Sequence, residues 1–311
     1  MIVDSLVDNV AEISEDVNYW FVRTDYGKYF ETFYNHNFIA IGWDNITLEE
    51  LRDPKKDDSI RKKLYKSEKL SENNPSHKRT VSSIVNKLHN FLNLKKGDVI
   101  IIPSQNSSRF AFGIIQNSQV YTEINNTLGC DYHKRKKVKW VAERYVKSLD
   151  PHFYMMKKTR HTISDISDYS VYIDNIINSL YIKNDNAHFV LDIKTQKDIN
   201  VDSLVSLINN IQDLNKKING YFNLNEQIDK NSIRLNLQSP GQIEFKMPVG
   251  KSLVTLATIL SITCCSPNNR NTPRELEQFI EANQDTIDKI RTSMDVLEVN
   301  RDKINSFSNG R

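Results

Sequence analysis

Short apolar runs separated by polar turns dominate the N-terminal half of the chain, and they predict a β-rich module. Residues 19–43 read as a strand, a turn at Asp25 and Gly27, a short aromatic-rich helix and a second strand. Residues 94–117 predict a strand, a polar turn and another strand, and a basic strand follows in residues 133–146. Such a module, with an aromatic-lined cleft, is typical of proteins that bind a ligand and need not transform it.

The C-terminal half predicts a second, smaller unit that combines a strand, a helix and a hairpin. The strand is expected over residues 188–194, and a single apolar stripe predicts a helix over residues 202–222. A hairpin is expected over residues 232–246, because residues 239–241 read Ser-Pro-Gly and supply the chemistry of a turn.

Apolar residues recur with alternating steps of four and three over residues 273–306, which predicts one long helix with a coiled-coil seam. The positions expected to contact a second copy of the chain are Ile280, Asn283, Ile287, Ile290, Met294 and Leu297. The same stripe fits a helix that packs on its own domain, and the sequence leaves both interpretations open.

The uncharged stretch within residues 249–265 is too short for a stable membrane span, which needs about 20 predominantly apolar residues. Ser and Thr also interrupt it repeatedly, so a buried helix is the expected structure. A membrane-acting effector that inserts this segment is the alternative.

These patterns predict an α+β fold with four parts. A lead-in helix spans residues 1–17, and a β-rich binding domain follows in residues 18–158, with a charged, mobile insertion at residues 52–80. A connector spans residues 159–182, and an αβ domain with a long C-terminal helix occupies residues 183–311.

The cysteines and the first 16 residues indicate the cellular compartment of the protein. Three cysteines, two of them adjacent at residues 264 and 265, provide neither a disulfide framework nor the usual spacing of a zinc site. The first 16 residues include five acidic ones and lack the basic start of a signal peptide, so no signal peptide is expected in them. A reducing cytoplasm is therefore the expected location.

Basic residues concentrate in residues 132–160, where ten Lys or Arg face two acidic residues, although the net charge of the chain is only +3. Such a stripe attracts phosphate groups with an affinity that falls as salt rises. The residues expected to hold phosphate are Lys134, Arg135, Lys136, Lys137 and Lys139. A solvated strand whose lysines keep the surface polar is the alternative.

Five short motifs in a fixed order resemble the PUA-like superfamily over about residues 15–150. They are YWFVR from residue 19, IAIGW from residue 39, KKGDVIIIP from residue 95, FAFGII from residue 110 and HKRKKVKW from residue 133. The chain is most similar to EVE-type domains and to the N-terminal modules of Mrr-like and McrB-like restriction proteins. This resemblance implies a β-barrel-like fold that binds nucleic acid, often a modified or flipped base, in bacterial anti-phage systems.

The candidate ligand-binding residues are Trp20, Arg23, Trp43, Ser104 and Trp140. The three tryptophans lie in the motifs of the resemblance, and their rings offer faces on which a base stacks. The roles of Arg23 and Ser104 are implied by the resemblance. Tryptophans in a small β-domain also serve as core residues, and at least one of the three is expected to be buried.

A metal-dependent nuclease is the alternative function, because Asp192 and Lys194 form an Asp-x-Lys pair at the end of a predicted strand. That chemistry requires a second acidic metal ligand, and the nearest upstream candidate, Asp185, lies outside the usual sequence context. The chain has no P-loop, no Gly-x-Gly-x-x-Gly and no nucleophile elbow.

The sequence therefore predicts non-catalytic recognition of nucleic acid or a nucleotide-like ligand, with no metal and no cofactor. The expected setting is a bacterial defence or restriction system. The expected partners are the ligand itself, a second copy of the chain through the C-terminal helix, and a further defence protein.

Overall fold

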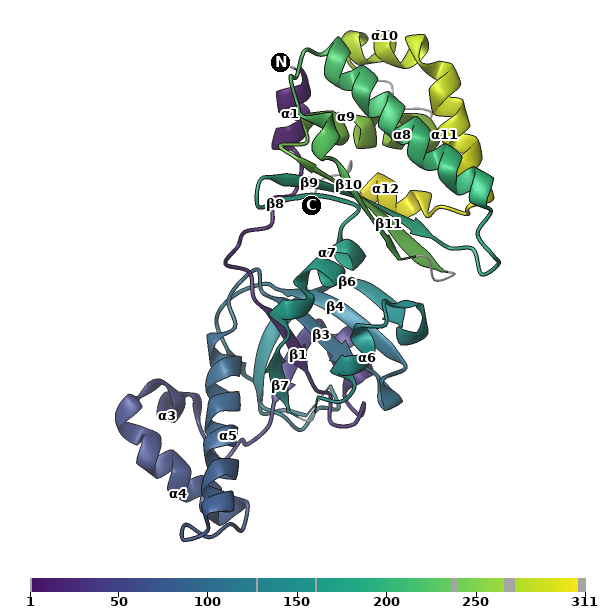
Figure 1. Ribbon diagram of the computed structural model, residues 1–311. Helices are drawn as coiled ribbons and strands as arrows, with labels where there is room; N and C mark the ends of the chain where they lie inside the picture. The colour runs from purple at the N-terminus through teal and green to yellow at the C-terminus, as the bar shows by residue number, and fades with distance from the viewer. Residues whose placement is uncertain (1, 127, 160, 237–239, 266–271, 307–311) are drawn as a thin grey trace. The chain divides into compact units, whose positions relative to one another are not determined.

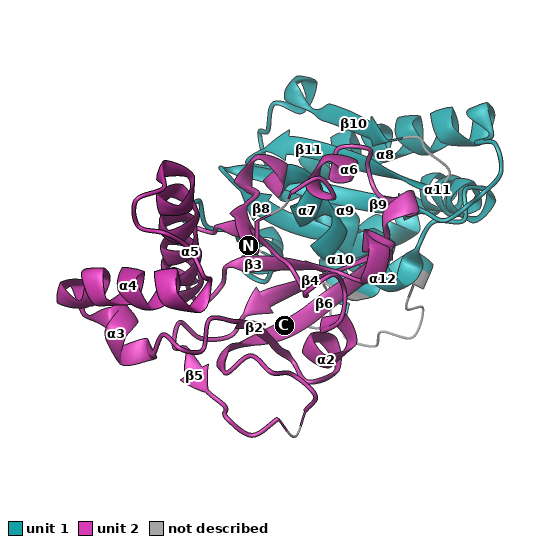
Figure 2. Ribbon diagram, turned by 90° about the horizontal axis from the view of Figure 1, so that it is seen from below, with its two compact units in different colours: residues 1–16, 171–311 teal, residues 17–170 magenta. Residues whose placement is uncertain are grey.

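The computed structural model (Figure 1) describes residues 2–126, 128–159, 161–236, 240–265 and 272–306. The chain forms two compact units, coloured separately in Figure 2. Residues 17–170 form the central unit, and residues 1–16 together with 171–311 form the terminal unit. The predicted lead-in segment thus belongs to the terminal unit, and the predicted connector is divided between the two.

A seven-stranded mixed sheet, which curls into a half-barrel, organises the central unit (Figure 1). Its strands are β1 (Tyr19–Val22), β2 (Phe38–Ile41), β3 (Val99–Pro103), β4 (Arg109–Ile115), β5 (Tyr121–Thr122), β6 (Lys134–Tyr145) and β7 (Ile163–Asp165). The strand order is β2-β6-β4-β3-β1-β7, with β5 beside β6; β1 and β3 are parallel, and the other pairs are antiparallel. This mostly antiparallel sheet with separate helices agrees with the predicted α+β class.

Apolar side chains bury both faces of this sheet. One face packs against α5 (Pro75–Asn93), whose buried residues are Val81, Ile84, Val85, Leu88 and Phe91. On the other face the rings of Phe112 and Phe153 lie 6.2 Å apart, and Phe153 belongs to α6 (Phe153–Met156). Each such fully buried side chain contributes about 1.5–3 kcal/mol.

The helix α5 is fixed at both ends. At its start the side chain of Asn74 accepts a hydrogen bond from the backbone nitrogen of Ser76, and Pro75 occupies the first helical position. At its end the Lys136 ammonium donates to the carbonyl oxygens of Leu92 and Leu94, which satisfies acceptors that the helix leaves open. The helix is therefore held firmly against the sheet.

The segment predicted as an insertion, residues 52–80, is helical over much of its length and includes α4 (Asp57–Ser67). It follows α3 (Leu48–Arg52), which begins with a complete capping box between Thr47 and Glu50. Ile60 and Leu64 of α4 are buried, so a sequence that looks uniformly charged still has one apolar face. The short α2 (Phe30–Asn35) completes the helices of this unit that precede α5.

A four-stranded antiparallel sheet organises the terminal unit, in the order β10-β11-β9-β8. Its strands are β8 (Leu180–Lys183), β9 (Asn186–Ile193), β10 (Ser232–Asn236) and β11 (Gly241–Pro248). Its helices are α1 (Ile2–Asp8), α7 (Ser170–Ile177), α8 (Val201–Tyr221), α9 (Lys251–Leu260), α10 (Arg274–Ala282), α11 (Gln284–Val296) and α12 (Arg301–Ser306). The predicted helix 202–222 and hairpin 232–246 are found here, although residues 237–239 of the hairpin turn lie outside the described residues.

The single long helix predicted over residues 273–306 is wrong, because the chain forms α10, α11 and α12 instead. Asn283 breaks the first two apart with backbone angles φ −121° and ψ 19°. Ile287, Ile290, Met294 and Leu297 are buried in the core of their own unit, while Ile280 and Asn283 are half-buried. The stripe therefore packs within its own unit, as the second interpretation expects, and is not exposed to a second copy.

The apolar stretch 249–265 forms α9 and a following π-helical turn, and α9 lies at the centre of the terminal unit (Figure 1). Val254, Leu256 and Leu260 are completely buried among the helices and the sheet of this unit. In the part of the chain that the structure describes, no helix is both long and apolar enough to cross a membrane.

Candidate functional site

Two of the three predicted tryptophans lie in one row across the central sheet. Trp20 is in register with Ile100, Ile100 with Gly113, and Gly113 with Trp140, so these side chains share the face that α5 covers. Trp140 donates its indole N–H to the carbonyl oxygen of Phe33 at 3.0 Å. A Cβ on Gly113 would lie 2.5 Å from its ring, so Trp140 is tightly packed against the sheet. Trp140 therefore acts as a structural residue, although all three tryptophans are half-buried and none is fully buried as expected.

Trp20 and Trp43 lie closer to polar surroundings. The indole nitrogen of Trp20 is buried and has no hydrogen-bond partner among the described residues. Trp43 follows β2 with a positive φ of 57°, and its half-buried ring lies 5.9 Å from the ammonium of Lys87 on α5. A cation at this distance from an indole ring is held weakly and stays available to a ligand.

Arg23 and Ser104 stabilise loops. The Arg23 guanidinium donates to the carbonyl oxygens of Lys157, at 2.8 Å, and Thr159. The hydroxyl of Ser104 accepts from the backbone nitrogen of Arg109 at 2.9 Å and closes the turn between β3 and β4. Neither side chain lies in the cleft described below.

Three of the five basic residues predicted to hold phosphate are inaccessible, and this part of the prediction is corrected. Lys134, Arg135 and Lys136 are only 3%, 1% and 0% exposed. Lys134 contacts Asp44 at 2.8 Å and two carbonyl oxygens, and Arg135 donates to two carbonyl oxygens and covers the ring of Phe38. The reason is that this part of β6 lies between β2 and β5, inside the sheet. Lys137 and Lys139 remain exposed.

Asp192 and Lys194 do not form an open metal site. The Asp192 carboxylate accepts from Lys303 at 2.8 Å and from Gln242 at 2.7 Å, and Lys194 is exposed after the end of β9. Asp185 lies in the turn before β9, at the opposite end of the strand. Within the described ranges, no three His, Cys, Asp or Glu side chains gather closely enough to hold a metal ion.

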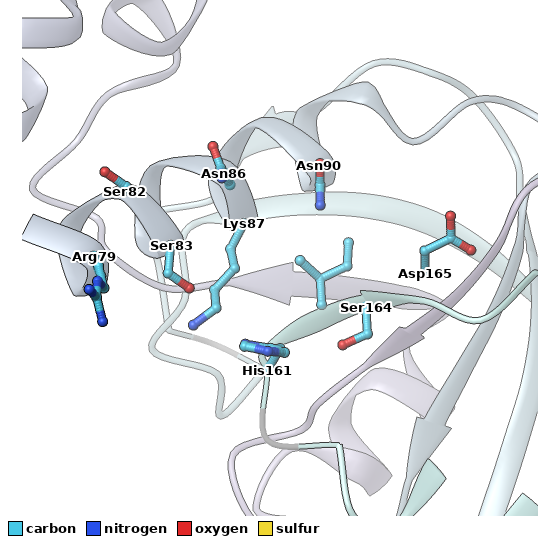
Figure 3. A pocket seen from close by; sticks show the side chains of 10 residues that line it. Arg79, Ser82, Ser83, Asn86, Lys87, Asn90, His161, Ser164 and Asp165 are labelled. Carbon is cyan, nitrogen blue, oxygen red and sulfur yellow. The ribbon is translucent and has the colours of Figure 1, made fainter. Parts of the chain in front are cut away.

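A cleft of about 500 Å³ lies between α5 and the edge strand β7 (Figure 3). Its volume falls in the range of small-molecule and cofactor sites. The lining residues are Arg79, Ser82, Ser83, Asn86, Lys87, Asn90, His161, Ile163, Ser164 and Asp165. Figure 3 shows the Lys87 side chain extending from the helix toward the side of the cleft where His161 lies. The cleft therefore combines an apolar floor at Ile163 with many hydrogen-bonding groups.

The electrostatics of the cleft favour an anion. Lys87 and Arg79 are cationic and form no ion pair with any residue that the structure describes, and Asp165 is the acidic residue of the lining. Burial lowers the pKa of Lys87 below its ordinary value, which means that its charge is incompletely compensated. The buried hydroxyl oxygen of Ser164 likewise lacks a hydrogen-bond partner within the described part of the chain.

Three of the predicted residues connect to this cleft. Trp43 lies beneath Lys87, and Trp20 is in register with Asp165 of β7. Arg23 holds the carbonyl oxygens of residues 157 and 159, just before His161 enters the cleft. These three candidates thus adjoin the cleft without lining it, whereas Ser104 and Trp140 make their contacts elsewhere in the central unit.

A family model, described as a domain of unknown function (DUF8426), matches residues 7–167, which is just over half of the chain. The chain belongs to this family. No curated protein and no solved structure matches it. The DUF8426 match includes all of the lining residues of the cleft.

The lining residues of this DUF8426 protein were missed because the cleft joins segments about 75 residues apart in sequence. One local signal exists: Arg79, Ser83, Asn86 and Asn90 recur at steps of four, three and four, so they form a polar stripe along α5. The β7 side has no comparable signal, because its strand has only three residues.

Proposed function

We propose that the central unit recognises nucleic acid or a nucleotide-like ligand without catalysing its conversion, and that the ligand occupies the cleft between α5 and β7. The observation that carries the proposal is Lys87, a half-buried cation in a cleft with no ion-pair partner among the described residues. Partial burial without an ion-pair partner disfavours the charged form of Lys87, so a ligand phosphate is the natural group to compensate it.

The expected attraction between Lys87 and a ligand phosphate is large enough to contribute to binding. A unit negative charge about 4 Å from Lys87 gains about 4 kcal/mol at the effective dielectric constant near a protein surface. Arg79 adds a second cation, while the Asn and Ser side chains of the lining offer donors and acceptors to a base or a sugar. Aspartate at position 165 disfavours a purely anionic ligand and suits one that also has hydrogen-bond donors.

The resemblance to the PUA-like superfamily supports nucleic acid as the ligand class. We propose that residues 15–150 form a PUA-like module of the EVE type, that a modified or flipped base is the specific target, and that the setting is bacterial anti-phage defence in the cytoplasm. In this proposal Trp43 and Lys87 present an aromatic face and a cation next to each other, a combination that suits a base and its phosphate.

A fluorescence-anisotropy titration tests the proposal. Purified protein is titrated against labelled DNA and RNA, plain and modified, at two salt concentrations with EDTA present. Lys87→Met is expected to weaken binding about tenfold or more, the equivalent of about 1.4 kcal/mol. Lys139→Met is the matched control, because Lys139 is an exposed lysine of β6 outside the cleft.

The two variants separate the outcomes. A loss confined to Lys87→Met supports the cleft as the site. A loss confined to Lys139→Met would assign phosphate binding to β6 instead, and equal losses in both variants would refute the cleft as the specific site. No binding of any nucleic acid or nucleotide by the wild type would refute the function.

A further inference from the structure

Cationic residues continue beyond the cleft along residues 52–80, which we name the basic arm. The arm contains ten Lys or Arg against five Asp or Glu. Arg61 pairs with Asp57 and Lys63 with Glu50, whereas the other eight cations form no ion pair with described residues and are all exposed. The arm therefore has an excess of five positive charges over its five acidic residues and presents a net positive surface.

The cleft and the basic arm are continuous. Arg79 lines the cleft and is also the last cation of the arm, and the guanidinium of Arg61 in α4 donates to the hydroxyl of Ser82, another lining residue. Figure 1 shows α4 beside the first half of α5. A ligand that leaves the cleft at Arg79 thus meets more positive charge.

The spacing of the cations indicates a ligand with several phosphates. Arg79 and Lys87 are eight residues apart on α5, about 12 Å along the helix axis. The lining residues span Arg79 to Asn90, about 16 Å of the same axis. A mononucleotide occupies only part of such a length, whereas a strand with several phosphates follows all of it.

We propose that the ligand is a single-stranded polynucleotide that enters the cleft with one nucleotide and continues along α5 and α4 with its phosphate backbone on the basic arm. This inference rests on the proposed function and specifies its substrate class. A cleft of about 500 Å³ has no room for a duplex, whereas it does hold a nucleotide of an unpaired strand. The backbone contacts supply affinity independently of sequence, and the cleft supplies selection.

A length series tests the inference. The wild-type full chain is titrated with a mononucleotide, a trinucleotide, a dodecamer single strand and a dodecamer duplex of the same sequence. The single-stranded dodecamer is expected to bind at least tenfold more tightly than the mononucleotide and the duplex. Equal affinity for mononucleotide and dodecamer, or a preference for the duplex, would overturn the inference while leaving the proposed function standing.

The triple variant Lys62→Gln, Lys66→Gln, Lys78→Gln tests the basic arm itself. If these residues contact phosphates, the slope of log K against log salt for the single strand becomes shallower by about 2. The triple variant Lys194→Gln, Lys197→Gln, Lys216→Gln is the control, because it removes the same charge from exposed positions of the terminal unit.

The mononucleotide separates the two claims. Its affinity is expected to stay unchanged in the arm variant and to fall in Lys87→Met. An unchanged salt slope in the arm variant, or a slope that falls equally in the control, would refute the role of the arm. Failure of every ligand to bind the wild type would instead refute the proposed function.

Discussion

The position of Lys87 predicts that the affinity for the ligand depends on pH. Burial lowers its pKa in the free protein, whereas a bound phosphate favours the charged form. Affinity for an oligo-dA probe should therefore fall as pH rises through this lowered pKa, before an ordinary lysine titrates at about 10.4. The measurement is the dissociation constant between pH 7 and 10.5 at constant ionic strength.

Lys87→Arg is the matched variant, because arginine keeps its charge over this whole range. It is expected to bind at pH 7 with near wild-type affinity and to show a flatter profile. If its profile matched that of the wild type, another group would be responsible for the loss.

The buried cations of β6 show that residue type alone does not predict whether a side chain is exposed. Lys134, Arg135 and Lys136 look like solvated cations in the sequence, yet each donates to carbonyl oxygens. Lys134 and Lys136 reach the loop after β2 and the end of α5, whereas Arg135 donates to the nearby carbonyl oxygens of Cys130 and Tyr132. The acceptors of the two lysines have no signature near residues 134–136. Trp140, a sequence-based candidate for stacking on a base, instead packs against the sheet and donates its indole N–H to the carbonyl oxygen of Phe33.

At the scale of the element, Lys136 at the C-terminal end of α5 makes the stability of the fold depend on pH. Burial lowers its pKa to about 8, below the value near 10.4 expected in the unfolded chain. Between these two values the unfolded chain holds the proton and the folded chain does not, so this residue makes stability rise with pH. The rise amounts to at most about 3 kcal/mol.

Lys136→Met is expected to lack this rise. The difference in unfolding free energy between wild type and variant should therefore increase from pH 8 to pH 10.5 in urea titrations. Parallel curves over this range would show that Lys136 does not titrate in the folded protein.

A substitution in the core of α11 is expected to lower stability without changing the oligomeric state. Ile290 is completely buried in the core of the terminal unit. Ile290→Ala should destabilise this unit by about 2–5 kcal/mol through the lost contacts and the cavity. Thermal melting measures the effect, and sedimentation measures the oligomeric state. A variant that keeps its melting temperature and dissociates from a dimer would restore the coiled-coil interpretation.

Local periodicity predicted the elements better than their connections. The strands near residues 19, 39, 99 and 109 and the helix over residues 201–221 all follow from the pattern of apolar positions. The break at Asn283 escaped notice because the apolar stripe continues through it without interruption. The cleft escaped because it needs β7, a three-residue edge strand that only its pairing with β1 defines.

At the scale of the molecule, the order of the two units along the chain predicts which pieces fold alone. The central unit is continuous, whereas the terminal unit requires residues 1–16. Ile182 and Ala11 form a backbone hydrogen bond of 2.9 Å, and Lys251 pairs with Asp4 at 2.7 Å. The excised fragment 17–170 should therefore fold cooperatively and bind the ligand with the affinity of the full chain.

Deletion of residues 1–16 provides the reciprocal experiment. It should lower the melting temperature of the terminal unit and leave binding intact. Loss of binding in the isolated fragment 17–170, despite a cooperative melting transition, would show that the terminal unit contributes to the site.

Mapping of the ligand by ultraviolet cross-linking and mass spectrometry tests the central claim most directly. The full chain is irradiated with a bound single-stranded oligonucleotide, and the modified peptides are identified. The account predicts cross-links in peptides that contain residues 79–90 and 161–165, with a loss of both in Lys87→Met. Cross-links confined to β6 or to the terminal unit, with none in α5 or β7, would contradict it.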